Sequence, residues 1–285
     1  MLMLQLPNIK DKRLIFLSFG ALILFCLAYY PAFSILFSKW ADSEEYSHAF
    51  LTLPIILYMA YQLKDRMMTS TPTLTSLGLI ILFVSSSLYF FSLLTEVHTA
   101  IALSMYLTVL GAVIFLFGIH SLRVLFTPLL LLFMLIPFPD QFYIQLTFPL
   151  QLKVSQMSAA VVNWVGIPVF RTGNVLTIPE KSFEVIEACS GLRSVITLLT
   201  LSVIMGYFML KRGWSKILLI AISIPVAIFV NLIRVIAIVL MFHFFRIDLY
   251  EGTLHTATGL FIFLIALATL FLFERILERW ECEKK

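Results

Sequence analysis

Long stretches of this sequence contain no Asp, Glu, Lys or Arg, and this feature limits the folds that the chain can adopt. The uncharged stretches are Leu14–Ser38, Met67–Thr95, Val97–Leu122, Val124–Pro139, Ser194–Leu210, Ile217–Ile233 and Gly252–Phe273. A helix needs about 20 mostly apolar residues to cross the hydrocarbon core of a bilayer. Backbone groups find no partner in hydrocarbon, so a chain inside it must be helical. The sequence therefore predicts an all-α polytopic membrane protein.

The composition supports this prediction. Hydrophobic residues make up 61% of the 285 residues and charged residues 13%, whereas a soluble domain is about half apolar and a quarter charged. The net charge of +4 does not indicate nucleic-acid binding, because the basic residues stand in short clusters between apolar runs. We expect a single integral membrane domain over residues 1–285 that contacts membrane lipids and no nucleic acid.

About eight transmembrane helices fit these stretches. We expect them near 14–37, 47–63, 76–94, 98–119, 123–138, 190–210, 215–240 and 255–273. With the N-terminus inside, most of the 20 basic residues fall on the inner side, as the positive-inside rule requires. The sequence thus predicts a multi-pass protein of the cytoplasmic (inner) membrane, with both termini in the cytoplasm and a cytoplasmic tail at 274–285.

The region at about 139–188, between the fifth and sixth expected spans, predicts an extracytoplasmic insert. Residues 141–165 mix polar and apolar side chains, so they form either a helix lying in the outer interface or a poor transmembrane span. Residues 166–188 alternate turn-forming and β-branched residues, which predicts a small extended hairpin. The turn-forming residues are Gly166, Pro168, Gly173, Asn174 and Pro179.

The last three spans, with the segment that leads into them at about 189–273, carry polar residues at matching positions. Arg193, Arg234 and His255 each stand roughly 18 residues, about 27 Å, from a charged residue at the inner end of the same span. The hydrocarbon core is about 30 Å thick, so these three side chains should share a depth near the outer boundary. Cys189 stands one helical turn before Arg193. If the seventh span instead runs over 225–245, Arg234 lies deeper, as a functional intramembrane charge.

Cysteine, arginine and histidine at one depth have a shared chemistry. The start of a helix and a nearby guanidinium both favour a nucleophilic thiolate at Cys189. The imidazole of His255 moves protons near neutral pH, and Arg234 offers a fork of donors to an oxyanion or a carboxylate. The set indicates acyl transfer or peptide cleavage. We interpret Cys26 as a packing residue and Cys282 as a solvated thiol. The three cysteines show no paired spacing and no CxxC, which indicates neither a zinc site nor a disulfide framework. We expect no metal and no cofactor.

Three short motifs resemble the signature of the exosortase/archaeosortase family of membrane transpeptidase-like proteases. Glu187–Arg193 (EACSGLR) resembles its cysteine motif and Asn231–Arg234 (NLIR) its arginine motif. His255, which opens the last span, resembles its histidine. Together and in this topology the motifs are specific, whereas each alone would be weak.

Further segments extend the resemblance over about Trp40–Phe273. IPFP at Ile136–Pro139 and GIPVFRTGN at Gly166–Asn174 have the expected order and spacing. Tyr46–Ala49 (YSHA) is similar to the Ser-His-Gly segment of bacterial members, with Ala49 where glycine is usual. This departure weakens any backbone role for that segment.

The resemblance implies an enzyme that processes exported proteins. Its substrates would carry a C-terminal signal made of a short motif such as Pro-Glu-Pro, a transmembrane helix and a basic tail. Cys189 would be the nucleophile, His255 the proton shuttle, and Arg234 the stabiliser of the oxyanion or substrate. The acyl-enzyme on Cys189 would pass to water or to an acceptor such as a lipid or a polysaccharide.

Further residues are candidates for substrate binding. A substrate glutamate needs a cation, which Arg171 or Arg193 could supply beside Arg234. Glu187 flanks the site with Arg193, and these two are equally well interpreted as a structural ion pair. Asn231 and His48 join the set because they belong to the matching motifs. The extended hairpin could pair with the substrate peptide by strand addition.

Two other function classes stay open at this point. A transporter or an assembly factor for exported polysaccharide would be non-enzymatic, and its signs would be charges near the bilayer centre or inverted repeats. A membrane metalloprotease would use Glu44, Glu45 and His48, although the sequence lacks the HExxH motif.

Overall fold

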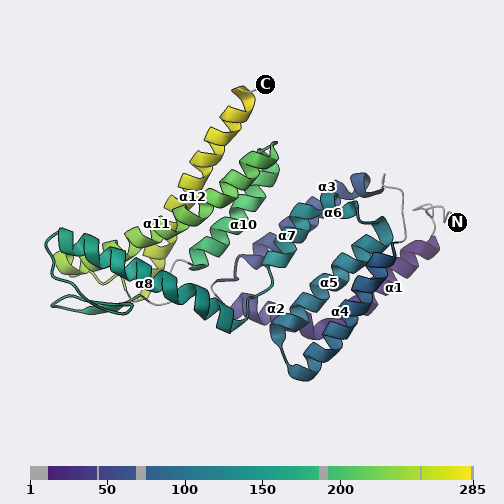
Figure 1. Ribbon diagram of the computed structural model, residues 1–285, viewed down its shortest axis with the longest axis horizontal. Coiled ribbons are helices and arrows are strands. Elements are labelled where there is room, and N and C mark those ends of the chain that lie inside the picture. The colour runs from purple at the N-terminus through teal and green to yellow at the C-terminus, as the bar shows by residue number, and fades with distance from the viewer. Residues whose placement is uncertain (1–11, 44, 69–74, 186–191, 251, 284–285) are drawn as a thin grey trace. The chain divides into compact units, whose positions relative to one another are not determined.

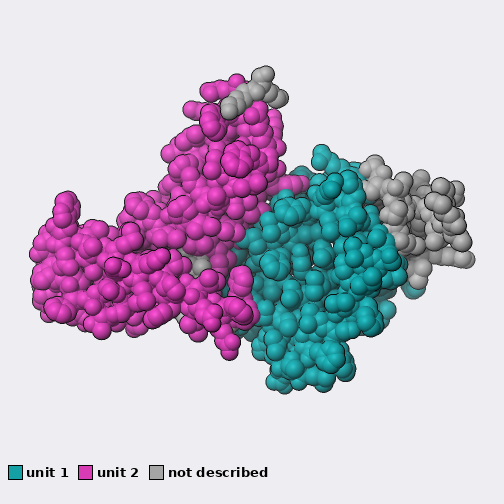
Figure 2. All heavy atoms as spheres, in the orientation of Figure 1, with its two compact units in different colours: residues 1–137 teal, residues 138–285 magenta. Residues whose placement is uncertain are grey.

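The computed structural model describes residues 12–43, 45–68, 75–185, 192–250 and 252–283 (Figure 1). By its internal contacts the chain divides into two compact units, Met1–Pro137 and Phe138–Lys285, which Figure 2 colours separately. Both units consist mainly of helices, as the sequence predicts. The expectation of a single membrane domain stays a prediction.

The described residues of the first unit form seven helices. They are α1 Lys12–Ala28, α2 Tyr30–Asp42, α3 Ala49–Met68, α4 Ser76–Thr95, α5 His98–Phe117, α6 Ser121–Val124 and α7 Phe126–Met134. The described residues of the second unit form four helices and three strands. They are α8 Asp140–Trp164, β1 Phe170–Thr172, β2 Val175–Thr177, β3 Ser182–Glu184, α10 Leu192–Met209, α11 Gly213–Phe245 and α12 Gly252–Glu283.

Four helices in the described ranges are long and apolar enough to cross a membrane, compared with the eight expected. These are α4, α5, α11 and α12, whose most apolar windows have mean hydropathies from 2.2 to 2.5. A fifth span is added if the bent pair Phe19–Ala28 and Tyr30–Asp42 counts as one. The helices α3 and α10 occupy the second and sixth expected spans without reaching this combination of length and apolarity. The count of eight is therefore not confirmed.

The first expected span, 14–37, is broken into two helices. The helical segments on either side of Tyr29 differ in direction by 67°. Pro31 stands in the first turn of α2, where its missing N–H has no helical partner to lose. In an unbroken helix the same proline would remove a hydrogen bond and clash with the preceding turn. A bend at this point is therefore the conformation that the proline favours.

The fifth expected span, 123–138, is also divided, into α6 and α7. The nine residues of α7 rise only about 14 Å, which is less than half of a hydrocarbon core about 30 Å thick. Pro137 and Pro139 follow shortly after α7 and disfavour helical backbone at the residues before them. A full span at 123–138 is not confirmed for this reason.

Helices α4 and α5 pack closely through small and hydroxyl side chains. A Cβ on Gly78 would lie only 2.5 Å from the backbone nitrogen of Phe115, so only glycine fits there. The hydroxyl of Thr108 donates to that of Ser85 over 2.9 Å and is bonded to the Tyr29 hydroxyl over 2.6 Å. Close packing and interhelical hydrogen bonds associate helices in lipid, where the hydrophobic effect between them is absent.

The insert of the second unit contains one long helix and a small sheet. The helix expected over 141–165 is present as α8, and its position in the interface stays a prediction. The three strands form an antiparallel sheet in the order β1-β2-β3. Gly173 has φ +63° in the two-residue turn between β1 and β2, as such hairpin turns require. The predicted hairpin is thus confirmed, and β3 adds a third strand.

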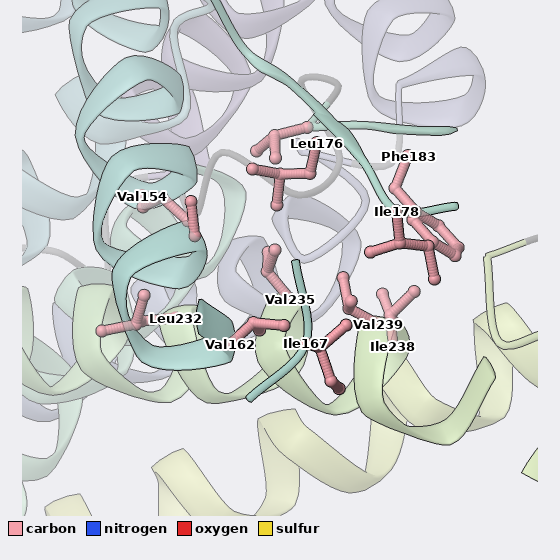
Figure 3. Packing of buried hydrophobic residues seen from close by; sticks show 12 residues of the cluster. Val154, Val162, Ile167, Leu176, Ile178, Phe183, Leu232, Val235, Ile238 and Val239 are labelled. Atoms are coloured by element: carbon pink, nitrogen blue, oxygen red, sulfur yellow. The ribbon is translucent and has the colours of Figure 1, made fainter. Parts of the chain in front are cut away.

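One face of this sheet packs against α8 and the second half of α11 (Figure 3). Leu176 of β2 pairs with Phe183 of β3, and both are almost fully buried. They meet Val162 of α8 and Val239 of α11 in the same hydrophobic core. Because burial of such side chains contributes about 1.5–3 kcal/mol each, the sheet is held firmly onto the end of α11.

Helices α10, α11 and α12 form the rest of the second unit. Leu198, Leu219 and Leu270, one from each helix, are completely buried in a shared core. At the turn between α10 and α11, the two carboxylate oxygens of Glu281 accept the backbone N–H groups of Lys211 and Arg212 over 2.9 and 3.0 Å. Glu281 therefore ties the C-terminal part of α12 to the start of α11.

Candidate active site

Two of the three predicted catalytic side chains are in direct contact. Nη2 of Arg234, on α11, lies 2.9 Å from Nε2 of His255, in the first turn of α12. The same Nη2 lies 3.5 Å from the backbone oxygen of His255. Arginine has only donors, so Nε2 of His255 accepts this hydrogen bond. The shared depth that the sequence predicts for Arg234 and His255 is thus a contact in the structure.

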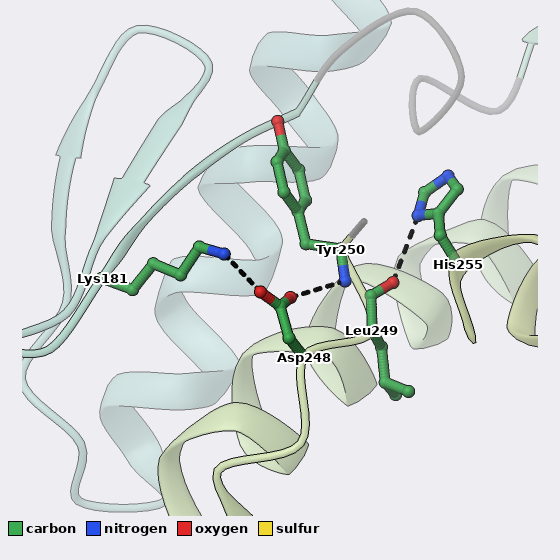
Figure 4. Close-up of polar contacts among 5 residues, drawn as sticks. All are labelled: Lys181, Asp248, Leu249, Tyr250 and His255. Carbon is green, nitrogen blue, oxygen red and sulfur yellow. Dashed lines mark hydrogen bonds and ion pairs between the residues drawn. The ribbon is translucent and has the colours of Figure 1, made fainter. Parts of the chain in front are cut away.

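The second ring nitrogen of His255 completes the assignment of its proton. Nδ1 lies 3.2 Å from the backbone oxygen of Leu249 (Figure 4). A carbonyl oxygen can only accept, so Nδ1 carries the proton and donates it. His255 is therefore a neutral imidazole with its hydrogen on Nδ1, and the lone pair of Nε2 faces Arg234. Hydrogen bonds on both sides hold the ring in this tautomer.

The guanidinium of Arg234 occupies the space beside Gly259 that a larger side chain would fill. Arg234 is only 8% exposed, and Gly259 stands one helical turn after His255 on the same side of α12. A Cβ on Gly259 would lie 3.1 Å from Nη2 and 3.4 Å from Cζ of Arg234. Gly259 is not among the site residues predicted from the sequence. The sequence feature that could have pointed to it is a glycine inside an apolar helix, where glycine lowers helix stability by about 1 kcal/mol relative to alanine.

The linker between α11 and α12 is held by an ion pair that the sequence analysis also missed. Nζ of Lys181, in the β2–β3 turn, lies 2.5 Å from Oδ2 of Asp248. Oδ1 of Asp248 accepts the backbone N–H of Tyr250 over 2.9 Å. The hydrogen bond from Lys181 lowers the pKa of Asp248, against an opposing effect of burial. No local pattern in the sequence indicates this pair, because Lys181 and Asp248 are 67 residues apart.

A second ion-pair group joins the same two segments. Oε1 of Glu180 lies 3.3 Å from Nη2 of Arg246 and 3.4 Å from Nδ1 of His243. Partial burial would raise the pKa of Glu180, but hydrogen bonds from its own backbone and from His243, with the charge of Arg246, lower it overall. The β2–β3 turn is therefore attached to the end of α11 at two points.

The other predicted site residues have separate positions. Cys189 and Glu187 lie outside the described residues. Arg193 is half-buried in the first turn of α10, and Asn231 is 2% exposed on α11, three residues before Arg234 and on the same face. Arg171 is an exposed residue of β1.

The guanidinium of Arg171 donates from Nη1 to the backbone oxygen of Gly173 over 2.7 Å, within its own hairpin. His48 belongs to the first unit, in the turn before α3, where its Nδ1 lies 2.9 Å from the backbone oxygen of Glu45. Glu44, the other acid of the metalloprotease alternative, lies outside the described residues.

Several apolar helices of spanning length define a multi-pass membrane protein, and its second unit holds a partly buried Arg–His contact between α11 and α12. The family model described as Transmembrane exosortase (Exosortase_EpsH) matches residues 40–272. The chain belongs to the transmembrane exosortase family. Comparison with curated proteins finds no match, and comparison with solved structures finds none either. The matched range agrees with the extent of the resemblance in the sequence.

Proposed function

We propose that this protein is a cysteine protease or transpeptidase that removes a C-terminal sorting signal from exported proteins through an acyl-enzyme on Cys189. The observation that carries the proposal is the hydrogen bond between Arg234 and His255. It provides a base with a defined tautomer beside a permanent cation, which are the partners that a thiol nucleophile requires. Membership of the exosortase family supports the same reaction class.

The proposed reaction needs one proton shuttle. Nε2 of His255 takes the thiol proton of Cys189, and the thiolate attacks the carbonyl carbon of the scissile peptide bond. The guanidinium of Arg234 stabilises the negative charge that develops on the carbonyl oxygen. The C–N bond then breaks, and Nε2 returns its proton to the leaving amine. Water, or an amine or hydroxyl acceptor of a lipid or polysaccharide, then cleaves the thioester.

The contact between Arg234 and His255 determines the order of the steps in the proposed reaction. While Nη2 donates to Nε2, the lone pair of the imidazole is occupied and cannot accept the thiol proton. A substrate carbonyl or carboxylate that draws the guanidinium toward itself would free Nε2 for proton transfer. In this proposal the substrate itself activates the base, and His255 does not take the thiol proton in the free enzyme.

The proposed substrates follow the same logic. They would carry a motif such as Pro-Glu-Pro, a transmembrane helix that lies beside the enzyme, and a basic cytoplasmic tail. The scissile bond would then meet Cys189 on the extracytoplasmic side of the inner membrane, with both termini of the enzyme in the cytoplasm and eight spans in total. Arg171 and Arg193 are proposed to bind the substrate glutamate, with Glu187, Asn231 and His48 as further contacts.

A processing assay tests this proposal. Cys189→Ala, expressed in a strain without its own copy of the protein, should accumulate a full-length substrate that keeps its C-terminal helix. Cys189→Ser should be almost as inactive, because a hydroxyl is much less acidic than a thiol. Mass spectrometry of the new C-terminus of a processed substrate identifies the cleavage site and the acceptor together. If Cys189→Ala kept its full biological function, a non-enzymatic role as transporter or assembly factor would replace this proposal.

A further inference from the structure

The imidazole of His255 keeps its proton on Nδ1 through two contacts, the Arg234 donor at Nε2 and a backbone carbonyl at Nδ1. Its Nδ1 donates to the oxygen of Leu249, which lies in the linker between α11 and α12. If this carbonyl turned away, the proton could move to Nε2, and the ring would then present a donor instead of a lone pair to the site. Whatever fixes the peptide unit of Leu249 therefore contributes to the state of the predicted base, together with the Arg234 contact.

The carboxylate of Asp248 fixes this peptide unit from one side. Its Oδ1 accepts the N–H of Tyr250, two residues ahead, over 2.9 Å. A carboxylate bonded to the backbone two residues on forms an Asx turn. The turn encloses Leu249, so its carbonyl points toward His255 (Figure 4).

The ammonium of Lys181 fixes Asp248 from the other side. Nζ lies 2.5 Å from Oδ2 of Asp248. It also lies 5.5 to 5.8 Å from the ring centroids of Phe183, Phe242 and Tyr250, at distances where a cation is attracted to the ring faces. The ring of Tyr250 in turn meets the imidazole of His255 edge to face, with centroids 6.4 Å apart. Lys181 thus contacts Asp248 and the ring of Tyr250, and Tyr250 in turn contacts His255.

We propose that Lys181 and Asp248 are positioning residues that hold His255 in its Nδ1–H tautomer through the Leu249 carbonyl. The inference rests on the proposed function only for its effect on catalysis, because the tautomer is a property of the free protein. In the described part of the chain, the hydrogen bonds observed for these two side chains join them to each other and to the backbone of Tyr250. The β2–β3 turn, which carries Lys181, thereby becomes part of the catalytic half of the molecule.

The second ion-pair group supplies matched controls. Glu180 and Arg246 join the same turn to the end of α11, and they have no hydrogen bond to Leu249 or His255 among those observed in the described residues. Asp248→Ala can therefore be compared with Glu180→Ala, and Lys181→Met with Arg246→Met. Each comparison removes an equivalent charge from the same two segments. Lys181→Arg keeps the charge and tests rescue.

The first measurement is the tautomer of the full-length protein labelled with ¹⁵N in its five histidines. Solid-state NMR distinguishes protonated from unprotonated Nδ1, and His255→Gln identifies the signal of His255. We expect Asp248→Ala and Lys181→Met to lose the pure Nδ1–H signal, while Glu180→Ala, Arg246→Met and Lys181→Arg keep it. An unchanged His255 signal in Asp248→Ala would overturn the inference.

The second measurement is processing of a reporter that ends in a Pro-Glu-Pro segment, an apolar helix of about 20 residues and a basic tail. Asp248→Ala and Lys181→Met should lower kcat about tenfold and leave KM unchanged, and the matched controls should process at the wild-type rate. Equal losses of kcat in Asp248→Ala and Glu180→Ala would show that Lys181 and Asp248 only hold the two segments together, and would overturn their positioning role. Failure of the wild type to process the reporter, or full processing by Cys189→Ala, would refute the proposed function while the NMR result still decides the inference.

Discussion

Nη2 of Arg234 donates a hydrogen bond to Nε2 of His255 over 2.9 Å, so the predicted cation occupies the lone pair of the predicted base. The two residues come from neighbouring helices, α11 and α12, and stand 21 positions apart in the sequence. In a low-dielectric site such a bond is stronger than in water. The contact couples the position of the guanidinium to the lone pair of Nε2, on which the proposed reaction depends.

Arg234→Lys should abolish most of the processing activity. One ammonium cannot reach Nε2 of His255 and an oxyanion with the planar fork that a guanidinium provides. We expect a loss on the order of 100-fold in the rate of reporter cleavage, the range found when an oxyanion donor is removed. Arg246→Lys, in an exposed residue at the end of the same helix, is the control and should cleave normally. Normal cleavage by Arg234→Lys would remove the argument from forked donors.

Gly259→Ala should displace the guanidinium of Arg234. The added Cβ would lie 3.1 Å from Nη2, which is tighter than ordinary contact, so the guanidinium must shift by a few tenths of an ångström and its 2.9 Å contact with His255 is disturbed. We expect about a tenfold lower cleavage rate. Gly206→Ala, whose Cβ would meet Lys216 at an ordinary 3.6 Å, should keep its activity and gain up to about 1 kcal/mol of helix stability. Equal activity of the two variants would contradict the close approach of Arg234 to α12.

Glu281→Gln should destabilise the second unit. The amide replaces one of the two oxygens that accept the N–H groups of Lys211 and Arg212, so a donor then faces a donor. Leaving a buried polar group without a partner costs about 1–3 kcal/mol, which thermal unfolding in detergent would detect. Glu278→Gln removes only an exposed pair with Arg275, worth about 0–1 kcal/mol. A stability loss as large in Glu278→Gln would show that charge, and not the α10–α11 turn, is responsible.

The clasp between Lys181 and Asp248 should open in acid. The hydrogen bond from Lys181 lowers the pKa of Asp248 below its unfolded value of about 3.9, although burial opposes it. A carboxyl with a depressed pKa in the folded state contributes stability above its unfolded pKa, and this contribution is lost as the pH falls through the folded value. Hydrogen exchange at the Tyr250 amide, corrected for its intrinsic rate, should therefore accelerate only below about pH 4. Asp248→Asn should lack this acid step, and an identical step in that variant would assign it to another group.

The helical segments could be predicted from the sequence because apolarity is a local property. Long uncharged runs gave the positions of α4, α5, α11 and α12, since hydrocarbon admits no other backbone structure. The same reasoning predicted one span at each of 14–37 and 123–138, where the structure has two helices each. There the prolines decide the backbone conformation, and mean hydropathy does not register them.

The sequence by itself determined the apolar helices, the turn at Gly173 and the motifs that identify the transmembrane exosortase family. Helix rise also predicted that Arg234 and His255 share a depth, because 1.5 Å per residue holds for every helix. Only the tertiary structure decided that they touch, that Gly259 admits the guanidinium, and that Lys181 reaches Asp248 across 67 residues of sequence. Such contacts depend on how helices rotate and pack against one another, and no periodicity within a single helix encodes them.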